Sequence, residues 1–460
     1  MNVEVLVIKL HGRFIGHLFR YALPMSRPVI RFVASPEYAA EPWDHVDVLS
    51  ESMRAADPEQ QQSFWLDVTR PDFNTVVGAH GDFQLPPFFQ NLLPEGVFRR
   101  FVADEANIDS TDHMAMLAAC GKNLPGAVTA EWEELQRSAL QRLVTQNQDA
   151  LEVTVAAEPF QDAISISGVQ PKLGVNKTKE GRFVGRTTAL DDVSIIAKLP
   201  STEHVRMPEV EGLCMQLAQK AGVNVCEFAL VPLSEFGAPH RYDLGDEVNG
   251  NFLAVTRFDR NQSKRVHFED FAQVFSLPPE RKYEGSYRDV ADVLLSLPQC
   301  GEDAVQELVR RIEVNELLGN SDMHLKNLGL IYRDRKNAEL APAYDITSTL
   351  LFVGSVGHAL HLLPGSNAIK GSPLWSPSNL RDFANALGLQ VPKLSKVVQE
   401  VAAKAAQSWL DPILESKLTA KQKHTLLSFV GGHPHVVAAL RRLRRLDLLQ
   451  RWKDSVQIVG

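Results

Sequence analysis

The densest group of residues that could carry out chemistry lies at 319–327. This segment reads GNSDMHLKN, so Asp322 and Asn327 are separated by four residues. An aspartate at this spacing can accept the proton of an attacking hydroxyl, while the asparagine amide oxygen binds Mg²⁺, as in loops that catalyse phosphoryl transfer. His324 and Lys326 would add donors or positive charge near phosphates. A polar turn after a helix is the alternative, because Gly, Asn, Ser and Asp are common turn residues.

A second aspartate, Asp345, follows in the segment APAYDITS. The apolar residues 328–332 and the charged turn 333–337 predict a β-hairpin, which would bring Asp345 back beside Asp322 and Asn327. Because Mg²⁺ prefers oxygen ligands, these side chains and nucleotide phosphates would suit it. A helix N-cap is the other interpretation of an aspartate before Ile-Thr-Ser.

Lys198 ends the apolar, strand-like segment VSIIAKLP. A lysine there would ordinarily extend its amine to solvent. In a nucleotide site it would instead hold phosphates and pair with a carboxylate of the next helix. Glu209 and Glu211 both begin that helix, and Glu211 shares a face with Met215 and Ala218. We therefore expect an ion pair between Lys198 and Glu211.

The segment ISISGVQPKLG at 164–174 contains a glycine loop, but it matches neither GxxxxGK[ST] nor GxGxxG. Its backbone N–H groups and Lys172 could cover phosphates. A hairpin loop without a ligand explains the segment equally well.

Composition restricts the class of protein. The 460 residues are 44% hydrophobic and 23% charged, which is ordinary for a globular chain, and 48 Lys and Arg against 56 Asp and Glu give a net charge of −8. The whole chain is therefore no basic coat for nucleic acid, although a local patch could still bind it. The 4 cysteines form no CxxC pair, which favours free thiols in a reducing cytoplasm over disulfides or structural zinc. With no apolar run of about 18 residues and no apolar core near Met1, we expect neither a membrane span nor a signal peptide.

The elements that must position these residues suggest three domains. We expect 1–130 to open with a β-hairpin, 3–10 and 14–19, around the turn His11-Gly12-Arg13. Two short helices and a polar helical connector should follow, at 98–105, 112–120 and 131–147. Short apolar strands and one helix predict a domain at 131–260, with strands at 164–175, 193–199, 228–232 and 252–258 and the helix at 208–221. The remainder, 261–460, should be helical, with helices at 303–318, 379–387, 393–410 and 436–449.

Two further groups have weaker signals. The histidine pairs His358 and His361, and His433 and His435, have no acidic or cysteine companions nearby in the sequence, so we expect them on the surface. Four arginines crowd the C-terminal region, at Arg441, Arg442, Arg444 and Arg445. They could be a solvated helix face, or they could meet an acidic partner or DNA phosphates.

With these residues assembled, the chain resembles the HipA family of bacterial toxin kinases. The matching stretches are SISGVQPK at 165–172, IIAKLP around Lys198, VEGLCMQLAQKAGVNV from Val210, AVTRFDR at 254–260, HFEDFAQVF at 267–275, GNSDMHLKN and PAYDITS. Their order and spacing agree over about 160–350. Two earlier pieces, NLLPEGVFRRFVA from Asn91 and LAACGKNLPGAV from Leu117, resemble the N-terminal subdomain of that family.

The resemblance implies an α+β, two-lobed protein-kinase-like fold, with a small β-rich N-terminal subdomain, a larger helical C-terminal lobe and an ATP site between the lobes. It implies that Asp322 is the catalytic base and that Asn327 and Asp345 hold Mg²⁺. The residues expected to bind the nucleotide are Ser167, Gly168, Val169, Gln170, Pro171, Lys172, Lys198, Thr256, Arg257, Phe258, His324, Leu325, Lys326, Asn327, Tyr344 and Asp345. Family members also autophosphorylate a loop serine, for which Ser165 is the best match and Ser167 the second.

The resemblance also implies partners and a role. Characterised members of the family act on aminoacyl-tRNA synthetases and are held by a small helix-turn-helix antitoxin of the HipB type, so contact with DNA would be indirect. We expect a cytoplasmic serine/threonine kinase that is the toxin of such a pair. A catalytically silent kinase-like regulator that binds nucleotide and antitoxin, and a stand-alone kinase without a toxin role, are the alternatives.

Three departures from the family pattern bear on these expectations. Thr256 stands where an acidic residue is common, which would move adenine contacts to the backbone. Met323 replaces a glycine in the catalytic motif, which could slow the loop or change the choice of substrate. The divergent segment 24–84 puts antitoxin contacts on that side in doubt.

Overall fold

The computed structural model describes residues 2–22, 29–42, 45–75, 85–134, 170–179, 181–184, 193–238, 242, 244, 250–261, 264–354, 356–366 and 373–459. These residues form antiparallel sheets of four, two, three and five strands, together with helices that dominate the second half of the chain. No helix in these ranges combines the length and the apolar character needed to cross a membrane.

The first sheet has the strand order β3-β2-β1-β4. Its strands are β1 (Asn2–Leu10), β2 (Arg13–Ala22), β3 (Val29–Ala34) and β4 (Val128–Trp132). The predicted opening hairpin is confirmed. His11 and Gly12 have φ values of 51° and 79°, and a two-residue turn with both φ angles positive matches the twist of the strands it joins.

β4 corrects the predicted polar helix at 131–147. Glu131 and Trp132 are strand residues, because β4 pairs with β1 from Leu10 opposite Val128 to Leu6 opposite Trp132. Pairing with a strand far away in the sequence overrides the helical composition of the segment. The first sheet thus extends past residue 130, and residues 135–147 of the predicted connector lie outside the described residues.

Short helices cover this sheet and confirm both predicted helices of the first domain. The helices are α1 (Pro36–Ala39), α2 (Gln61–Leu66), α3 (Pro87–Gln90), α4 (Gly96–Ala106) and α5 (His113–Cys120), with 3₁₀ turns η1 (Glu51–Met53), η2 (Pro58–Gln60) and η3 (Pro71–Phe73). Asp112 caps α5 by accepting the N–H of Ala115. The core between sheet and helices is rich in aromatic rings, including Phe32, Trp65 and Phe73.

The second sheet, in the order β6-β5-β7-β9-β8, is the one that carries Lys198. Its strands are β5 (Lys172–Lys177), β6 (Phe183–Val184), β7 (Ile195–Lys198), β8 (Phe228–Pro232) and β9 (Asn251–Thr256), and η6 (Leu233–Glu235) follows β8. The predicted helix is α7 (Met207–Ala221), which packs on β8 and β9. Glu211 and most other residues of α7 are buried, so this helix lies inside the molecule and not on its surface.

The second half of the chain is mainly helical, as predicted. Its helices are α8 (Phe271–Val274), α9 (Tyr287–Ser296), α10 (Gly301–Leu318), α11 (Leu350–Val353), α12 (Pro377–Ala386), α13 (Val391–Ser408), α14 (Leu410–Glu415), α15 (Ala420–Gly432), α16 (Pro434–Arg442) and α17 (Leu446–Val459), with η8 (Pro279–Arg281) and η9 (Leu325–Asn327). The single helix predicted at 436–449 is wrong. The chain breaks between α16 and α17, where Arg444 has a left-handed φ of 55°.

A three-stranded sheet confirms the predicted hairpin before Asp345. It consists of β12 (His267–Asp270), β13 (Gly329–Tyr332) and β14 (Glu339–Leu340), with β13 in the middle. The neighbouring β10 (Arg260–Asn261) and β11 (Lys264–Arg265) form a two-stranded ribbon.

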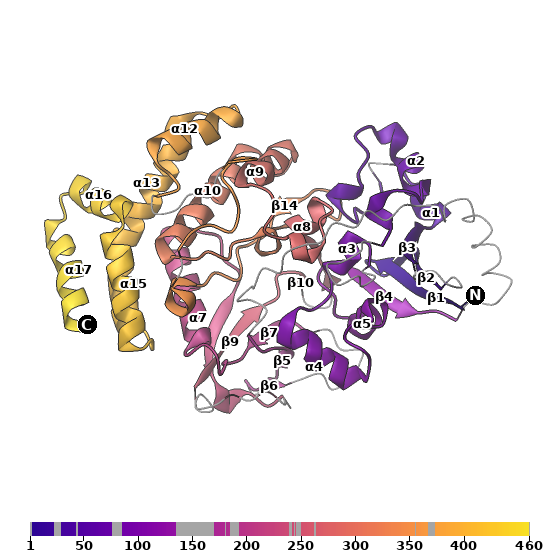
Figure 1. Ribbon diagram of the computed structural model, residues 1–460, viewed down its shortest axis with the longest axis horizontal. Helices are drawn as coiled ribbons and strands as arrows, with labels where there is room; N and C mark the ends of the chain where they lie inside the picture. The colour runs from indigo at the N-terminus through magenta and orange to yellow at the C-terminus, as the bar shows by residue number, and fades with distance from the viewer. Residues whose placement is uncertain are drawn as a thin grey trace.

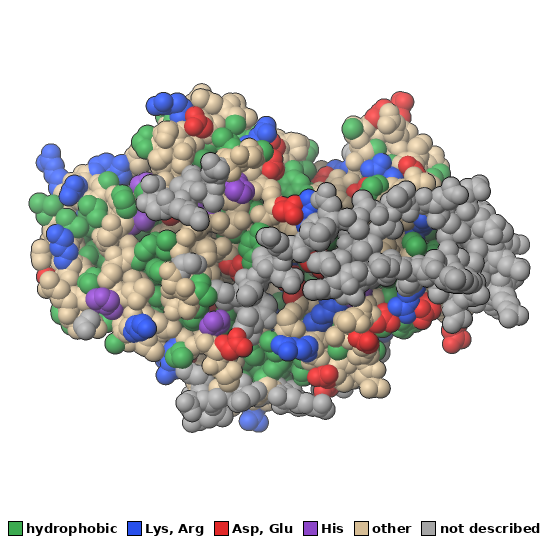
Figure 2. All heavy atoms as spheres, in the orientation of Figure 1, with side chains coloured by type: hydrophobic (Ala, Val, Ile, Leu, Met, Phe, Trp, Pro, Cys, Tyr) green, Lys and Arg blue, Asp and Glu red, His purple; other side chains and the backbone are tan. Residues whose placement is uncertain are grey.

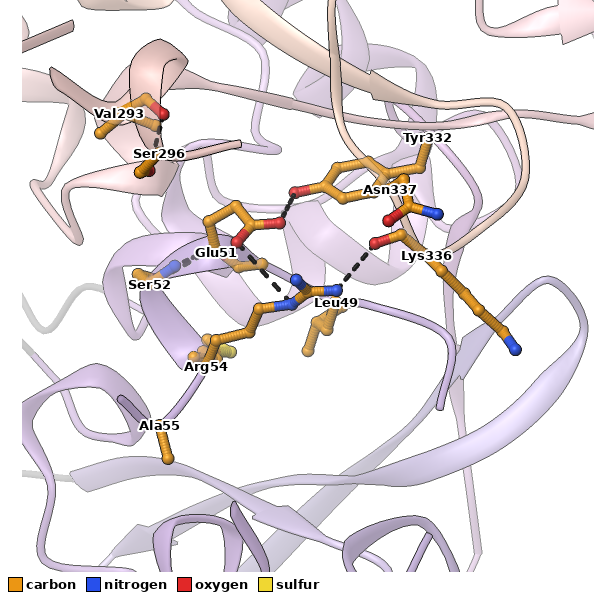
Figure 3. Close-up of polar contacts among 12 residues, drawn as sticks. Leu49, Glu51, Ser52, Arg54, Ala55, Val293, Ser296, Tyr332, Lys336 and Asn337 are labelled. Atoms are coloured by element: carbon orange, nitrogen blue, oxygen red, sulfur yellow. Dashed lines mark hydrogen bonds and ion pairs between the residues drawn. The ribbon is translucent and has the colours of Figure 1, made fainter. Parts of the chain in front are cut away.

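The first domain is attached to the helical part by polar contacts at η1. Figure 3 shows Glu51 between Arg54 and the Tyr332 hydroxyl, which donates to Glu51 Oε1 at 3.1 Å, and Arg54 donating to the backbone oxygen of Lys336 at 2.7 Å. The neighbouring Glu269, fully buried on β12, accepts hydrogen bonds from the Ser50 hydroxyl and the Glu51 N–H and lies in contact with the Tyr332 hydroxyl. Burial raises the pKa of the Glu269 carboxyl to about 8.

Figure 1 places these parts along one axis. The first sheet lies at one end, α15, α16 and α17 lie at the other, and the second sheet with α7 and α10 lies between them. The two-lobed, α+β kinase-like class predicted from the sequence agrees with this arrangement.

Candidate active site

The amine of Lys198 is enclosed by two carboxylates at the end of β7. Its Nζ contacts Oε1 of Glu211 on α7 and Oδ1 of Asp345, and the three side chains are only 7%, 3% and 19% exposed. Lys172 stands opposite Lys198 in the pairing of β5 with β7. Two cationic and two anionic side chains therefore meet where β7 ends in the middle of the second sheet.

The positive charges keep Asp345 ionised. Burial alone would raise the pKa of its carboxyl, but Lys198 and Lys172 hold that pKa well below its usual value. Burial lowers the pKa of the Lys172 amine, whereas the two carboxylates outweigh burial at Lys198 and raise the pKa of its amine. Burial also raises the pKa of Glu211 despite its contact with Lys198.

Asp345 is held by backbone pairing on its N-terminal side. Ala343 accepts the N–H of Cys226 at 2.9 Å and donates its own N–H to Asn224 at 2.7 Å. Asp345 itself has φ of 58°, a left-handed conformation that is uncommon for a residue other than glycine and that is found at functional sites. The hairpin β13–β14 and this bridge therefore deliver the carboxylate to Lys198.

The loop that carries Asp322 begins at the end of α10. Gly319 terminates the helix with φ of 65°, and Asn320 then folds back, its amide donating to Asn315 Oδ1 at 2.6 Å. The side-chain oxygen of Asn320 accepts the N–H of Asp322 at 3.0 Å. The two asparagines thus define the path of the chain into Asp322.

The segment after Asp345 supports the same loop from the other side. Thr349 Oγ1 accepts the N–H of Ser321 at 2.8 Å and donates to the oxygen of Gly319 at 3.0 Å, while the Ser348 hydroxyl donates to the oxygen of Leu318 at 2.6 Å. Because Ser348 and Thr349 are fully buried, these bonds are shielded from water. The segments containing Asp322 and Asp345 therefore form one unit.

Asp322 and Asn327 are oriented by specific hydrogen bonds. The hydroxyl of Tyr283 donates to Asp322 Oδ1 at 2.6 Å. The Asn327 amide nitrogen donates to the Asp322 backbone oxygen at 2.7 Å, which assigns the other end of the amide, its oxygen, as the atom that a cation could bind. Tyr283 was not predicted from the sequence, since nothing in its own neighbourhood distinguishes it from other surface tyrosines.

His324 is a buried residue of the site whose ring nitrogens have no hydrogen-bond partner among the described residues. The residue is 1% exposed, and both of its ring nitrogens are buried. Burial and the charge of Lys282 lower its pKa to about 3, so the ring is neutral and can donate one hydrogen bond. An orphaned donor beside Asp322 suits an oxygen-rich ligand such as a phosphate.

Lys326 and Leu325 differ from their expected roles as nucleotide contacts. Lys326 Nζ donates to the backbone and side-chain oxygens of Asn91 and to Asp270, and it lies 3.6 Å from Glu95 Oε1. Leu325 is fully buried in the core of the helical part. Lys326 thus joins the first domain to the catalytic loop, a role that the sequence could not indicate because its partners lie far away in the chain.

The three residues expected near adenine, at the end of β9 and just after it, have different surroundings. Phe258 packs against Tyr344 and Phe268, with ring centroids 5.7 Å and 5.2 Å away, so it forms an apolar wall next to Asp345. The Arg257 guanidinium turns to Asp259 and to the backbone oxygens of Asn123 and Leu124. Thr256 uses its N–H to bond Glu227. Of the three, Phe258 offers a surface on which an adenine ring could pack.

Only the end of the predicted phosphate loop can be described. Ser165, Ser167, Gly168 and Val169 lie outside the described residues. Gln170 is buried with its amide directed at the oxygen of Leu199, at 3.4 Å. Pro171 accepts the N–H of Leu199, and Lys172 joins the charges around Lys198.

Met323 does not face the site. It therefore does not change the choice of substrate by direct contact, which was one expected consequence of its replacing a glycine. Its side chain is 4% exposed in the core of the helical part, and its sulfur accepts a hydrogen bond from Asn315. The methionine thus helps to pack the loop and cannot select a substrate by direct contact.

The residues present fit Mg²⁺ and a nucleotide. An ionised Asp345 and the amide oxygen of Asn327 are the hard oxygen ligands that Mg²⁺ prefers. Lys198 and Lys172 supply positive charge for phosphates, and the orphaned ring of His324 supplies a donor.

Comparison with known proteins adds a family to this geometry. The model of the HipA-like C-terminal domain matches residues 164–409, and that of the HipA N-terminal domain matches residues 6–131. The putative kinase Y4dM of Sinorhizobium fredii is 39% identical over 272 residues, which is 58% of this chain and 63% of that protein, so the match spans less than two thirds of the relative. The serine/threonine-protein kinase toxin HipA of Shewanella oneidensis is 26% identical over 321 residues, covering 64% of this chain and 69% of the toxin.

A solved structure shares the fold over nearly the whole chain. It is that of the Shewanella oneidensis HipA with HipB and operator DNA, and the alignment covers 95% of this chain and 99% of the other with a TM-score of 0.64 at 19% identity.

Proposed function

The chain belongs to the HipA family, and from that premise we propose that it is a protein serine/threonine kinase dependent on ATP and Mg²⁺. The observation that supports this most directly is the contact of Lys198 with both Glu211 and Asp345, beside a loop that holds Asp322 and Asn327 in defined orientations. Relatives named as kinases support the same reaction.

In the proposed mechanism, Asp322 is the base that takes the proton of an attacking serine or threonine hydroxyl. Tyr283 donates to Oδ1 of this carboxylate, so Oδ2 is the oxygen that would meet the substrate. Lys198, turning from Asp345 but remaining paired with Glu211, would hold phosphate oxygens. Mg²⁺ held by Asn327 and Asp345 would supply charge that offsets the phosphates.

The test compares the wild type with Asp322→Asn. The substitution removes the base but keeps the shape of the side chain, so we expect ATP binding to persist and phosphoryl transfer to fall at least about a hundredfold. Equal transfer rates would refute the assignment of Asp322. ATP binding without transfer in the wild type would instead favour a silent kinase-like regulator.

We further propose that a serine of the glycine loop, Ser165 or Ser167, is an autophosphorylation site. A phosphate would add about −1.5 to −2 charges beside the nucleotide and would weaken ATP binding, acting as an off-switch. Phosphopeptide mapping after incubation with Mg-ATP tests this proposal. A trans substrate labelled while both serines stay unmodified would contradict it.

For the biological role, we propose the toxin of a pair with a small helix-turn-helix antitoxin of the HipB type. The Shewanella protein of the same fold was solved with HipB and operator DNA, which supports such a partner. An aminoacyl-tRNA synthetase is the proposed protein substrate, on the resemblance to the family alone. A HipA-like kinase without a toxin role would phosphorylate protein yet leave growth unchanged when expressed without an antitoxin.

The arginines near the C-terminus are candidates for contact with that partner or with its DNA. Figure 2 shows basic side chains gathered at the end of the molecule where α16 and α17 lie. Arg442 donates to Gln399 and Arg445 pairs with Asp447, so part of this charge is already engaged. Arg441 and Arg444 are exposed.

A salt titration of operator binding by the antitoxin separates the two roles. If the arginines touch phosphates, the wild type steepens the slope of log K against log salt, and a variant with alanine at all four positions loses that increment. An unchanged slope with both proteins excludes contact with DNA, and loss of antitoxin binding without DNA identifies a protein interface.

A further inference from the structure

Two of the four histidines expected on the surface, His433 and His435, instead meet two glutamates inside the helical part, whereas His361 is exposed as expected. His433 caps the start of α16 and is 7% exposed, and His435 has a side chain that is 20% exposed. Facing them, Glu313 and Glu316 lie three residues apart on one face of α10 and are 0% and 8% exposed. The acidic companions were missed because they lie more than a hundred residues away in the sequence.

These side chains already form two pairs. His435 Nδ1 lies 2.9 Å from Glu313 Oε1, and His433 Nε2 lies 3.7 Å from Glu316 Oε1, which also accepts the N–H of Leu374 at 2.7 Å. One ligand atom from each of Glu313, His433 and His435 lies within 4.8 Å of those of the other two.

The pairs leave buried polar atoms without partners. Oε2 of Glu313 and Oε2 of Glu316 have no hydrogen bond among the described residues, and neither has Nδ1 of the neighbouring His358. An unsatisfied buried oxygen destabilises the fold, and Glu313 is completely enclosed. The unpaired Oε2 atoms of Glu313 and Glu316 are therefore available to bind a cation.

From this arrangement we propose a zinc-type divalent metal site formed by Glu313, His433 and His435, with Glu316 as the fourth ligand. Two imidazoles and two carboxylates form a tetrahedral donor set that Zn²⁺ accepts, with bonds of about 2 Å. Imidazole ligands disfavour Mg²⁺, so this site is chemically distinct from the one at Asn327 and Asp345.

The surroundings suit a metal more than an isolated ion pair. His435 is also hydrogen-bonded to the backbone of Trp375, and an outer hydrogen bond of this kind fixes the orientation of an imidazole that binds a metal. His433 would bind through Nε2, which already faces Glu316. That binding gives up the 3.3 Å bond by which Nδ1 caps α16 at the His435 N–H.

The site would join α16 to the end of α10. Glu316 is three residues before Gly319, where the loop of Asp322 begins, and the Asn315–Asn320 contact spans this turn. A metal here would therefore brace the C-terminal helices against the base of the catalytic loop.

The test measures metal binding by the full chain after treatment with a chelator. We expect equilibrium dialysis to give one Zn²⁺ per chain in excess Mg²⁺, Co²⁺ to give the visible absorption bands of a tetrahedral complex, and Zn²⁺ to raise the melting temperature. His435→Gln should weaken Zn²⁺ binding by at least about tenfold and abolish the Co²⁺ bands. His361→Gln, a change at an exposed histidine, should leave both unchanged.

Three results would overturn the proposal. They are no stoichiometric binding by the folded wild type, equal binding by His435→Gln, or an equal loss in His361→Gln, which would indicate binding elsewhere or a general loss of structure. Glu316→Gln keeps the size of its side chain and carries the same expectation, so it serves as the test if circular dichroism shows that His435→Gln is unfolded.

Discussion

Lys198→Met tests whether the contacts around this amine form a charged network. The variant leaves Glu211 and Asp345 in place, only 3% and 19% exposed, without the ammonium that both contact. Removing one member of a buried ion pair costs about 3–5 kcal/mol. Lys172 remains and its charge acts on both carboxyls. We therefore expect a loss at the lower end, about 3 kcal/mol at pH 8.

The loss should depend on pH in a defined direction. In the wild type the pKa of Asp345 is lowered, so its contribution to stability is complete above the unfolded value of about 4 and is lost only in acid. In the variant an unpaired buried carboxyl has a raised pKa, so the folded state holds a proton that the unfolded state releases. Stability then falls as pH rises, by up to about 1.4 kcal/mol per unit, and the deficit should be larger at pH 8 than at pH 5.5.

Urea unfolding followed by circular dichroism at the two pH values measures this deficit. Lys179→Met, a change at an exposed lysine close to the end of β5, is the matched control and should cost less than about 0.5 kcal/mol. A deficit for Lys198→Met no larger than that of the control, or one that is the same at both pH values, would refute the reasoning.

Three other changes probe separate parts of the account. Asp345→Asn should abolish the increase in ATP affinity that Mg²⁺ produces, while ATP without metal still binds. Calorimetric titration with and without Mg²⁺ measures this difference, and an unchanged effect of Mg²⁺ would contradict the proposed metal role of Asp345. Glu269→Gln should flatten the dependence of unfolding free energy on pH between 5 and 7. A carboxyl with pKa of about 8 in the folded state makes stability fall as pH rises through this window, by up to about 1.4 kcal/mol per unit, and the amide removes that effect. Parallel curves for variant and wild type would refute this prediction. Thr349→Val should cost about 2 kcal/mol in urea unfolding and slow transfer more than it weakens ATP binding. The change leaves the Ser321 N–H unpaired and removes one hydrogen bond from the Gly319 oxygen, which still accepts the N–H of Leu350. A neutral effect would show that these bonds do not support the loop.

Local patterns were sufficient for elements whose signals are local. The hairpin around His11-Gly12, α7 and α10 follow from turn residues and from apolar periodicity, and the structure has each of them within three residues of the predicted bounds. The pairing of Lys198 with Glu211 followed from a strand end and a helix face, which are also local signals.

Contacts between distant segments were not predictable in the same way. β4 is a strand because β1 pairs with it, and Lys326 turns to Asn91 because the first domain packs against the catalytic loop. The break at Arg444 depends on a single left-handed residue that no glycine marks. Tyr283 reaches Asp322 from a segment with no motif of its own.

The central claim, that this site transfers phosphoryl groups, is tested most directly by intact-mass spectrometry of the purified chain after incubation with ATP. The account predicts that the wild type gains the mass of at least one phosphoryl group with ATP and Mg²⁺, but not when Mg²⁺ is removed by a chelator. Asp322→Asn, folded and still binding ATP, should gain none. A gain of equal size in Asp322→Asn, or no gain by a wild type that binds Mg-ATP, would contradict it.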